Sequence, residues 1–138
     1  MLLTTPARVL VASLLAVLPV AAQHFPAHHL FVGDNGAQRA VRFDLTPAEV
    51  ATYQIGIGSR GVAIGPDGNL YVSRFNGNRV HVIAPDGTEL RQIGAGSPLA
   101  GPWGLCFGPG GALYVVSVTT DSVEFFDAAG VHQRSITQ

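Results

Sequence analysis

An internal repeat constrains the fold of this chain more than any other feature of its sequence. The tripeptide Leu-Tyr-Val stands at residues 70–72 and again at 113–115, and the related Leu-Phe-Val stands at 30–32, so the copies are 40 and 43 residues apart. In each copy a second motif begins eight residues after the leucine, at Gln38, Asn78 and Asp121. The longer second interval comes mostly from the loop at 94–101. Length changes confined to loops indicate a structural repeat.

Each copy consists of short apolar runs separated by turn residues. In the second copy the runs lie at 62–64, 70–72, 79–84 and 89–93, with Pro-Asp-Gly turns at 66–68 and 85–87. No window has the 3.6-residue apolar period of a helix, so each copy is predicted to be a four-stranded antiparallel meander. In the first copy the turn at 33–36 contains Asn-Gly, and strands are expected at 40–45 and 50–55.

A period of about 40 residues with four strands per unit is the signature of a β-propeller blade. The sequence therefore predicts an all-β fold, a propeller segment of about three four-stranded antiparallel blades. The predicted boundaries are a partial blade at 30–56, a full blade at 61–94 and a last blade at 104–138.

The order of motifs resembles that of the NHL-repeat β-propeller family. The second copy has a glycine-led strand at 61–64, Pro-Asp-Gly at 66–68, Leu-Tyr-Val at 70–72 and Asn-Arg-Val at 78–80. The last copy keeps Gly104, a glycine-proline turn at 108–111 and Leu-Tyr-Val. The resemblance covers roughly residues 29–138. It departs after Leu-Tyr-Val, where the family often has aspartate: Asp34 fits, but Arg74 and Ser117 stand in the later copies.

Residues 1–22 have the pattern of a cleaved signal peptide. They contain one basic residue, Arg8, then an apolar run at 9–20, and end in Val-Ala-Ala with small residues at the −3 and −1 positions. Cleavage is expected after Ala22, and the chain is predicted to be secreted or periplasmic. A membrane anchor is the alternative, but the run is shorter than the roughly 20 apolar residues that a span needs. Residues 23–29 are expected to be a flexible lead-in, although their three histidines also suggest a metal-binding tag.

Composition narrows the possible partners. The formal net charge is −1, and it becomes −2 without Arg8. No cluster of basic residues is present, so a nucleic-acid partner is not expected. The single cysteine, Cys106, cannot form an intramolecular disulfide. Because it takes the place of Ala63 in the preceding copy, we expect a small buried apolar side chain.

The number of blades leaves two alternatives open. Propellers usually close with about four to eight blades, and this chain has about three. Either it is a segment of a larger propeller, which we prefer slightly, or copies assemble, with two three-blade chains closing a ring of roughly six. An open segment would expose strand edges and apolar faces.

Loops on the faces of a propeller usually carry its binding sites. On this basis the sequence predicts a module that binds a protein, small-molecule or carbohydrate ligand, with no cofactor and no catalysis of its own. The candidate ligand-binding residues are Arg60, Arg74, Asn76, Asn78, Arg79 and Trp103. Packing between blades is the competing interpretation for Trp103, and bonding to backbone carbonyls for Arg79.

The family resemblance also implies a different class of function. Some related six-bladed propellers, such as lactonase-like hydrolases and amidating lyases, use histidines or carboxylates from several blades to bind a metal at the central channel. The residues here that could do so are His81, His132, Asp34 and Asp121. The two histidines do not share a repeat position, so no catalytic or metal-ligating residue is assigned. A truncated remnant without independent activity is a third possibility.

Overall fold

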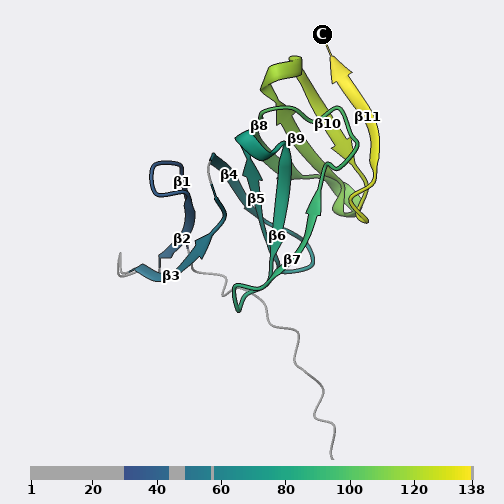
Figure 1. Ribbon diagram of the computed structural model, residues 1–138. Helices are drawn as coiled ribbons and strands as arrows, with labels where there is room; N and C mark the ends of the chain where they lie inside the picture. Colours follow the sequence, from purple (N-terminus) through teal and green to yellow (C-terminus); the bar gives the residue numbers. More distant parts are fainter. Residues whose placement is uncertain (1–29, 44–48, 57, 138) are drawn as a thin grey trace, which may run out of the picture.

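The structure, a computed structural model, describes residues 30–43, 49–56 and 58–137, and it consists of three antiparallel sheets (Figure 1). The first sheet has the strand order β1-β2-β3, the second β4-β5-β6-β7 and the third β11-β10-β9-β8. The strands are β1 (Leu30–Asp34), β2 (Arg39–Phe43), β3 (Glu49–Gln54), β4 (Ser59–Ile64), β5 (Leu70–Arg74), β6 (Arg79–Ile83), β7 (Glu89–Ile93), β8 (Pro102–Phe107), β9 (Leu113–Ser117), β10 (Ser122–Phe126) and β11 (His132–Thr137).

These strands confirm the predicted all-β class and the antiparallel meanders. The predicted signal peptide at 1–22 and the histidine-containing lead-in at 23–29 lie outside the described residues. Three short 3-10 turns complete the description: η1 (Phe75–Gly77), η2 (Pro109–Gly111) and η3 (Val118–Thr120). No helix in the described part of the chain is long and apolar enough to cross a membrane.

The turns that join the strands follow from local chemistry. In the two Pro-Asp-Gly turns the aspartate Oδ1 accepts a hydrogen bond from the backbone N–H two residues on, from Asn69 to Asp67 at 3.2 Å and from Thr88 to Asp86 at 2.9 Å. The glycine that follows has φ of 76° at Gly68, which glycine adopts without steric cost. The turn motifs are therefore explained by the meander alone.

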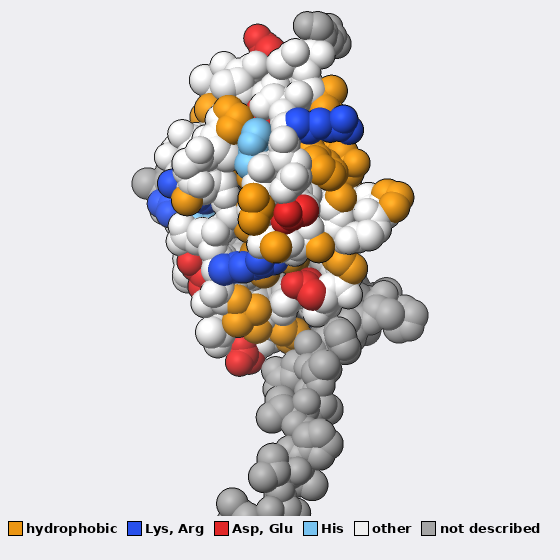
Figure 2. Space-filling view, turned by 90° about the vertical axis from the view of Figure 1, so that its right-hand side faces the viewer, with side chains coloured by type: hydrophobic (Ala, Val, Ile, Leu, Met, Phe, Trp, Pro, Cys, Tyr) orange, Lys and Arg blue, Asp and Glu red, His pale blue; other side chains and the backbone are white. Residues whose placement is uncertain are grey.

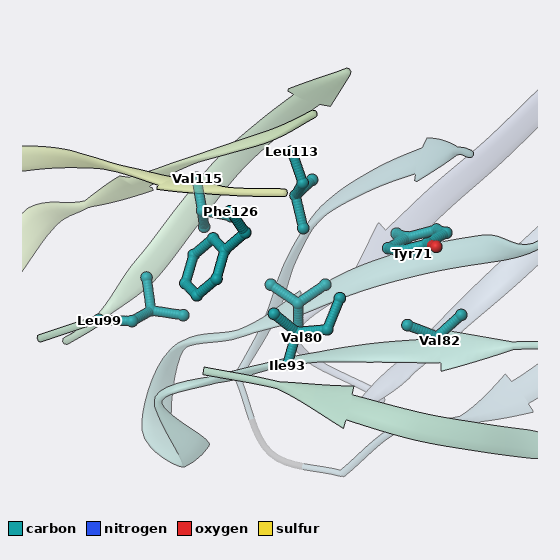
Figure 3. Close-up of a cluster of buried hydrophobic side chains, with 8 residues drawn as sticks. All are labelled: Tyr71, Val80, Val82, Ile93, Leu99, Leu113, Val115 and Phe126. Atoms are coloured by element: carbon teal, nitrogen blue, oxygen red, sulfur yellow. The ribbon is translucent and has the colours of Figure 1, made fainter. Parts of the chain in front are cut away.

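The core lies between the sheets. Strand alternation places Leu70 and Val72 against the first sheet and Tyr71 against the third, so the middle sheet is apolar on both faces. Figure 3 shows the larger cluster, in which side chains of the second and third sheets interdigitate. Its buried members are Tyr71, Val80, Val82, Ile93, Leu99, Leu113, Val115 and Phe126.

The outer sheets each have one face that no other described sheet covers, and this corrects the expectation for Cys106. Cys106 is exposed. Its neighbours Leu105 and Phe107 pack against the core between the second and third sheets, so alternation turns Cys106 to the opposite face of β8. The corresponding face of β4, which holds Ala63, lies against the third sheet. The copies therefore share a sequence pattern but differ in what covers them.

Two histidine–glutamate pairs occupy equivalent places with the residues exchanged. In the second sheet His81 Nδ1 lies 2.7 Å from Glu89 Oε2, and in the third sheet His132 Nε2 lies 2.7 Å from Glu124 Oε2. The repeat equivalents of His81 and Glu89 are Glu124 and His132. The member on the third strand of each sheet is buried in both cases, with His81 3% exposed and Glu124 fully covered. In the second and third sheets the pair is therefore kept while its members exchange places, and the first sheet has the buried apolar residue Val41 at the equivalent position.

This exchange makes a prediction about stability. His81→Glu alone would place two carboxylates together, and Glu89→His alone two imidazoles, so each should lower the free energy of unfolding by about 2 kcal/mol or more. The double variant His81→Glu/Glu89→His recreates the arrangement of the third sheet and should recover most of the loss. Urea unfolding of the four proteins measures the coupling. Losses that simply add in the double variant would contradict the exchange.

Glu124 makes a prediction about pH. Burial raises the pKa of the Glu124 carboxyl, but hydrogen bonds from Ser122, Ser135 and His132 outweigh burial and leave that pKa below its ordinary value. A carboxyl whose pKa is lowered by folding stabilises above its unfolded pKa, and this stabilisation is lost as pH falls through the folded value. We expect the free energy of unfolding to decrease below about pH 4.3, and Glu124→Gln to flatten this decrease. A decrease in Glu124→Gln as steep as in the wild type would contradict this role of Glu124.

Candidate functional site

All six candidate residues lie on one side of the sheets, which we call the top face and define by the starts of β4 and β8 and the turns η1 and η3. Ser59 at the start of β4 pairs with Arg74 at the end of β5, so η1 follows directly beside it. The strands β4 and β8 are edge strands of their sheets and contact each other. The loops that the sequence singled out therefore meet beside the two inner strands.

Arg60, Phe75 and Trp103 form a cation–aromatic cluster on the top face. Arg60 Cζ lies 4.6 Å from the centroid of the Trp103 ring and 5.6 Å from that of Phe75. The two rings meet edge to face, with centroids 6.0 Å apart. Trp103 keeps 47% of its surface exposed, so the cluster is accessible from solvent. A guanidinium over an indole is a favourable cation–π geometry.

The repeat itself brings Arg60 and Trp103 together. They occupy the same position in successive copies, immediately before Gly61 and Gly104. Ser73 Oγ donates a hydrogen bond to the Trp103 carbonyl at 2.5 Å and accepts one from the Gly61 N–H at 2.7 Å. A Cβ on Gly61 would collide with that same carbonyl. This close backbone approach fixes the separation of the two side chains.

Arg60 differs from its neighbours in having no polar partner among the described residues. Its Nε is buried without a hydrogen bond, and the guanidinium forms no hydrogen bond or ion pair with any residue that the structure describes. A guanidinium carries five donors in a planar fork that matches a carboxylate or phosphate. The arrangement therefore offers an anion a charged donor backed by two aromatic rings.

Two of the other candidates are held by backbone hydrogen bonds. Asn78 Oδ1 accepts a hydrogen bond from the Gly101 N–H at 2.8 Å, and its backbone is left-handed with φ of 50°. Arg79 donates from one terminal nitrogen to the carbonyls of Asn78 at 2.7 Å and Gly94 at 3.3 Å. Both side chains tie the second sheet to the loop that leads into β8.

Arg74 and Asn76 lie near the cluster but are not part of it. A Cβ on Gly56 would come within 3.0 Å of Arg74 Cζ, so the Arg74 side chain lies close against the end of the first sheet. Asn76 is exposed in η1. Phe75 is the member that sequence reasoning missed. The available signal was a large aromatic residue in a short turn that otherwise contains polar residues and glycine.

The residues considered for a metal lie apart. His81 and His132 each pair with a glutamate of their own sheet. Asp34 accepts hydrogen bonds from the Ala37 N–H at 3.0 Å and from Arg39 Nε at 3.2 Å. Among the described residues, no group of three or more His, Cys, Asp or Glu side chains could hold a metal ion.

Comparison with known proteins identifies the fold. No protein-family model matches the chain, and no curated protein matches it. A catalytically inactive virginiamycin B lyase from Staphylococcus aureus, solved with quinupristin, is similar with a TM-score of 0.66 and 20% identity over 80% of this chain and 38% of its own. Hydrazine synthase from Kuenenia stuttgartiensis is similar with a TM-score of 0.69 and 21% identity over 80% of this chain and 32% of its own. A candidate 6-phosphogluconolactonase from Bacteroides uniformis is similar with a TM-score of 0.62 and 17% identity over 82% of this chain and 40% of its own.

This likeness identifies the three sheets as blades of a β-propeller. The chain spans between 32% and 40% of the length of these structures. At identities of 17–21%, this similarity shows a shared fold but does not show a shared activity. The first, second and third sheets are accordingly the first, second and third blades.

The packing around Phe75 leads to a prediction with a matched control. Gly101 has φ of 61°, and a Cβ there would lie 2.9 Å from the Phe75 ring and 2.5 Å from Thr119 Oγ1. Gly96 has φ of 73° with nothing within 4 Å of the same atom. Alanine at either position incurs the left-handed backbone penalty, but Gly101→Ala also displaces Phe75 and should destabilise the protein by about 1–3 kcal/mol more.

Urea unfolding measures this difference, and the emission of Trp103, the single tryptophan, reports the displacement of Phe75. Equal losses of stability in Gly101→Ala and Gly96→Ala, with unchanged emission in both, would contradict the described packing of the cluster.

Proposed function

We propose that this chain is an exported, NHL-type propeller module that binds an anionic ligand on its top face and has no catalysis of its own. The site consists of Arg60, Phe75 and Trp103. The observation that carries the proposal is the Arg60 guanidinium, whose donors meet no acceptor in the described chain and whose Nε is buried.

The buried Arg60 Nε without a partner has an energetic cost that packing alone does not explain. Leaving a buried donor unsatisfied costs about 1–3 kcal/mol, and more for charged groups. The arginines that support the fold avoid this cost, since Arg79 and Arg91 donate to backbone carbonyls. A carboxylate or phosphate placed before Arg60 would accept its hydrogen bonds in the bidentate geometry that guanidinium favours.

The aromatic rings narrow the ligand class further. Trp103 is half-exposed and lies edge to face with Phe75, so a planar or apolar group beside the anion could stack on the indole. The proposed ligand therefore combines a negative charge with an adjacent flat or apolar surface. An acidic sugar, an aromatic carboxylate and an acidic peptide end all have this combination.

A second candidate function rests on the fold comparison. The matched structures are enzymes of different chemistry, a lyase, a hydrazine synthase and a candidate lactonase. On this alternative the chain belongs to a metal-dependent propeller enzyme of the lactonase or lyase type. Elemental analysis of the purified protein separates the two candidates, because stoichiometric zinc or calcium would contradict the pure-binding proposal.

The binding proposal is tested with simple probes that share the required chemistry. Benzoate and phenyl phosphate carry an anion beside a ring, and benzyl alcohol is the neutral analogue. Titration followed by Trp103 emission should show binding of the two anions and much weaker binding of the alcohol. Arg60→Ala should weaken anion binding roughly 10-fold to 100-fold, since a charge-assisted hydrogen bond contributes about 1.5–3 kcal/mol.

The control is another arginine stacked on a ring. Arg134 Cζ lies 5.5 Å from the Phe125 centroid in the third blade, and Arg134→Ala should leave probe affinity unchanged. Arg60→Lys keeps the charge but loses the fork and should give an intermediate affinity. Equal affinities of wild type and a folded Arg60→Ala protein for benzoate would refute the site.

A further inference from the structure

Two faces of this chain are apolar and have no described sheet against them. On the outer face of the third blade Val116 is 42% exposed and Ile136 43% exposed. On the outer face of the first blade Leu30 is 63% exposed and Val32 41% exposed, while Val41, in the middle strand of that face, is 2% exposed. Figure 2, which views the molecule from the β11 side, shows several patches of hydrophobic side chains on that surface. Apolar sheet faces of this kind usually mark a contact with another element.

The repeat identifies what the face of the third blade is built to contact. Each apolar residue on this face has a repeat equivalent in the second blade, and that equivalent packs against the third blade. The matched positions are Tyr71 and Tyr114, Val80 and Val123, Val82 and Phe125, and Ile93 and Ile136. This face therefore repeats a surface that binds another blade within the chain.

The face of the first blade is the opposite half of the same interface. Leu30, Val32 and Phe43 hold the repeat positions of three buried residues of the third blade. Those residues are Leu113, Val115 and Phe126, which pack against the second blade. The open face of the first blade is therefore of the same kind as the face of the third blade that packs against the second blade.

A hollow at the top edge of the third blade supports the inference that another blade packs on its open face. It has a volume of about 860 Å³, and Val116, Val118 and Asp121 are among its lining residues. The corresponding residues of the second blade hold the segment that enters β8: Ser73 bonds the Trp103 carbonyl, and Asn78 bonds the Gly101 N–H. The equivalent place in the second blade is therefore filled by the segment that enters β8, whereas in the third blade no described segment fills it.

We propose that the open face of the third blade binds the open face of the first blade of a second copy of this chain. A second copy is the partner that supplies the missing half, because both halves lie on every copy. The contact is head to tail, and two copies joined by two such contacts close a ring of about six blades, within the range in which propellers close. This inference does not rest on the ligand site.

Sedimentation equilibrium of the purified chain is the first test. Wild type should sediment at twice the chain mass at roughly micromolar concentration. Val116→Glu places a charge in the apolar contact and should weaken association about tenfold or more. Leu90→Glu is the control and should associate like wild type, because Leu90 is 53% exposed on β7 of the second blade and so belongs to neither open face.

Mixing two variants tests the head-to-tail geometry. Val116→Glu and Leu30→Lys should each weaken self-association while remaining folded by circular dichroism, because both positions are exposed. In a mixed pair one contact carries both substitutions and the other is wild type, whereas each variant alone has a substitution in both contacts. The mixture should therefore form a heterodimer, held at least by its wild-type contact, more tightly than either variant forms a homodimer.

Three results would overturn the proposal. The first is a wild-type monomer at all concentrations tested, which would leave these faces to other blades of a longer polypeptide or to no partner. The second is equal association of Val116→Glu and Leu90→Glu. The third is a mixture that associates no better than its separate components.

Discussion

Packing of sheet against sheet is the interaction on which the rest of this structure depends. A blade of three or four short strands has apolar residues on both faces, as Leu70 and Tyr71 show within one strand, so each neighbouring blade stabilises it. Stacking the second and third blades brings β4 against β8. That contact, tightened by Ser73 and Gly61, sets Arg60 over Trp103. The candidate site is a consequence of how the blades pack.

The fold could be predicted from sequence because its determinants are local. Pro-Asp-Gly turns, glycines with positive φ and alternating apolar runs specify a meander without reference to distant residues, and β7 begins and ends where the pattern places it. Exposure could not be predicted in the same way. Cys106 and Ala63 share a motif position, but only Ala63 has a described blade over its face. Phe75 was missed for a related reason, since its role depends on Trp103 in a strand of the next blade.

The three copies also show which residues serve the fold. Gln38, Asn78 and Asp121 share a repeat position and all have positive φ, between 47° and 59°, although their side chains differ. The histidine–glutamate pairs persist in the second and third blades while the two residues exchange places, and the first blade has Val41 at the equivalent position. A backbone conformation that recurs in all three copies is required by the blade. Asn78 and Arg79 looked functional because they form a motif, but their side chains bond the backbone.

Function is better sought where equivalent positions differ in chemistry without a structural reason. Arg60 and Trp103 occupy one repeat position, and nothing in the backbone there demands either side chain. The indole offsets part of the cost of a partly buried guanidinium through cation–π attraction, but it supplies no acceptor for the donors of Arg60. A residue kept for packing alone would not need a charge at this place, whereas a residue that receives an anion would. This reasoning holds whether the ring is closed by further blades or by a second copy, because the cluster is built from the second and third blades of a single chain.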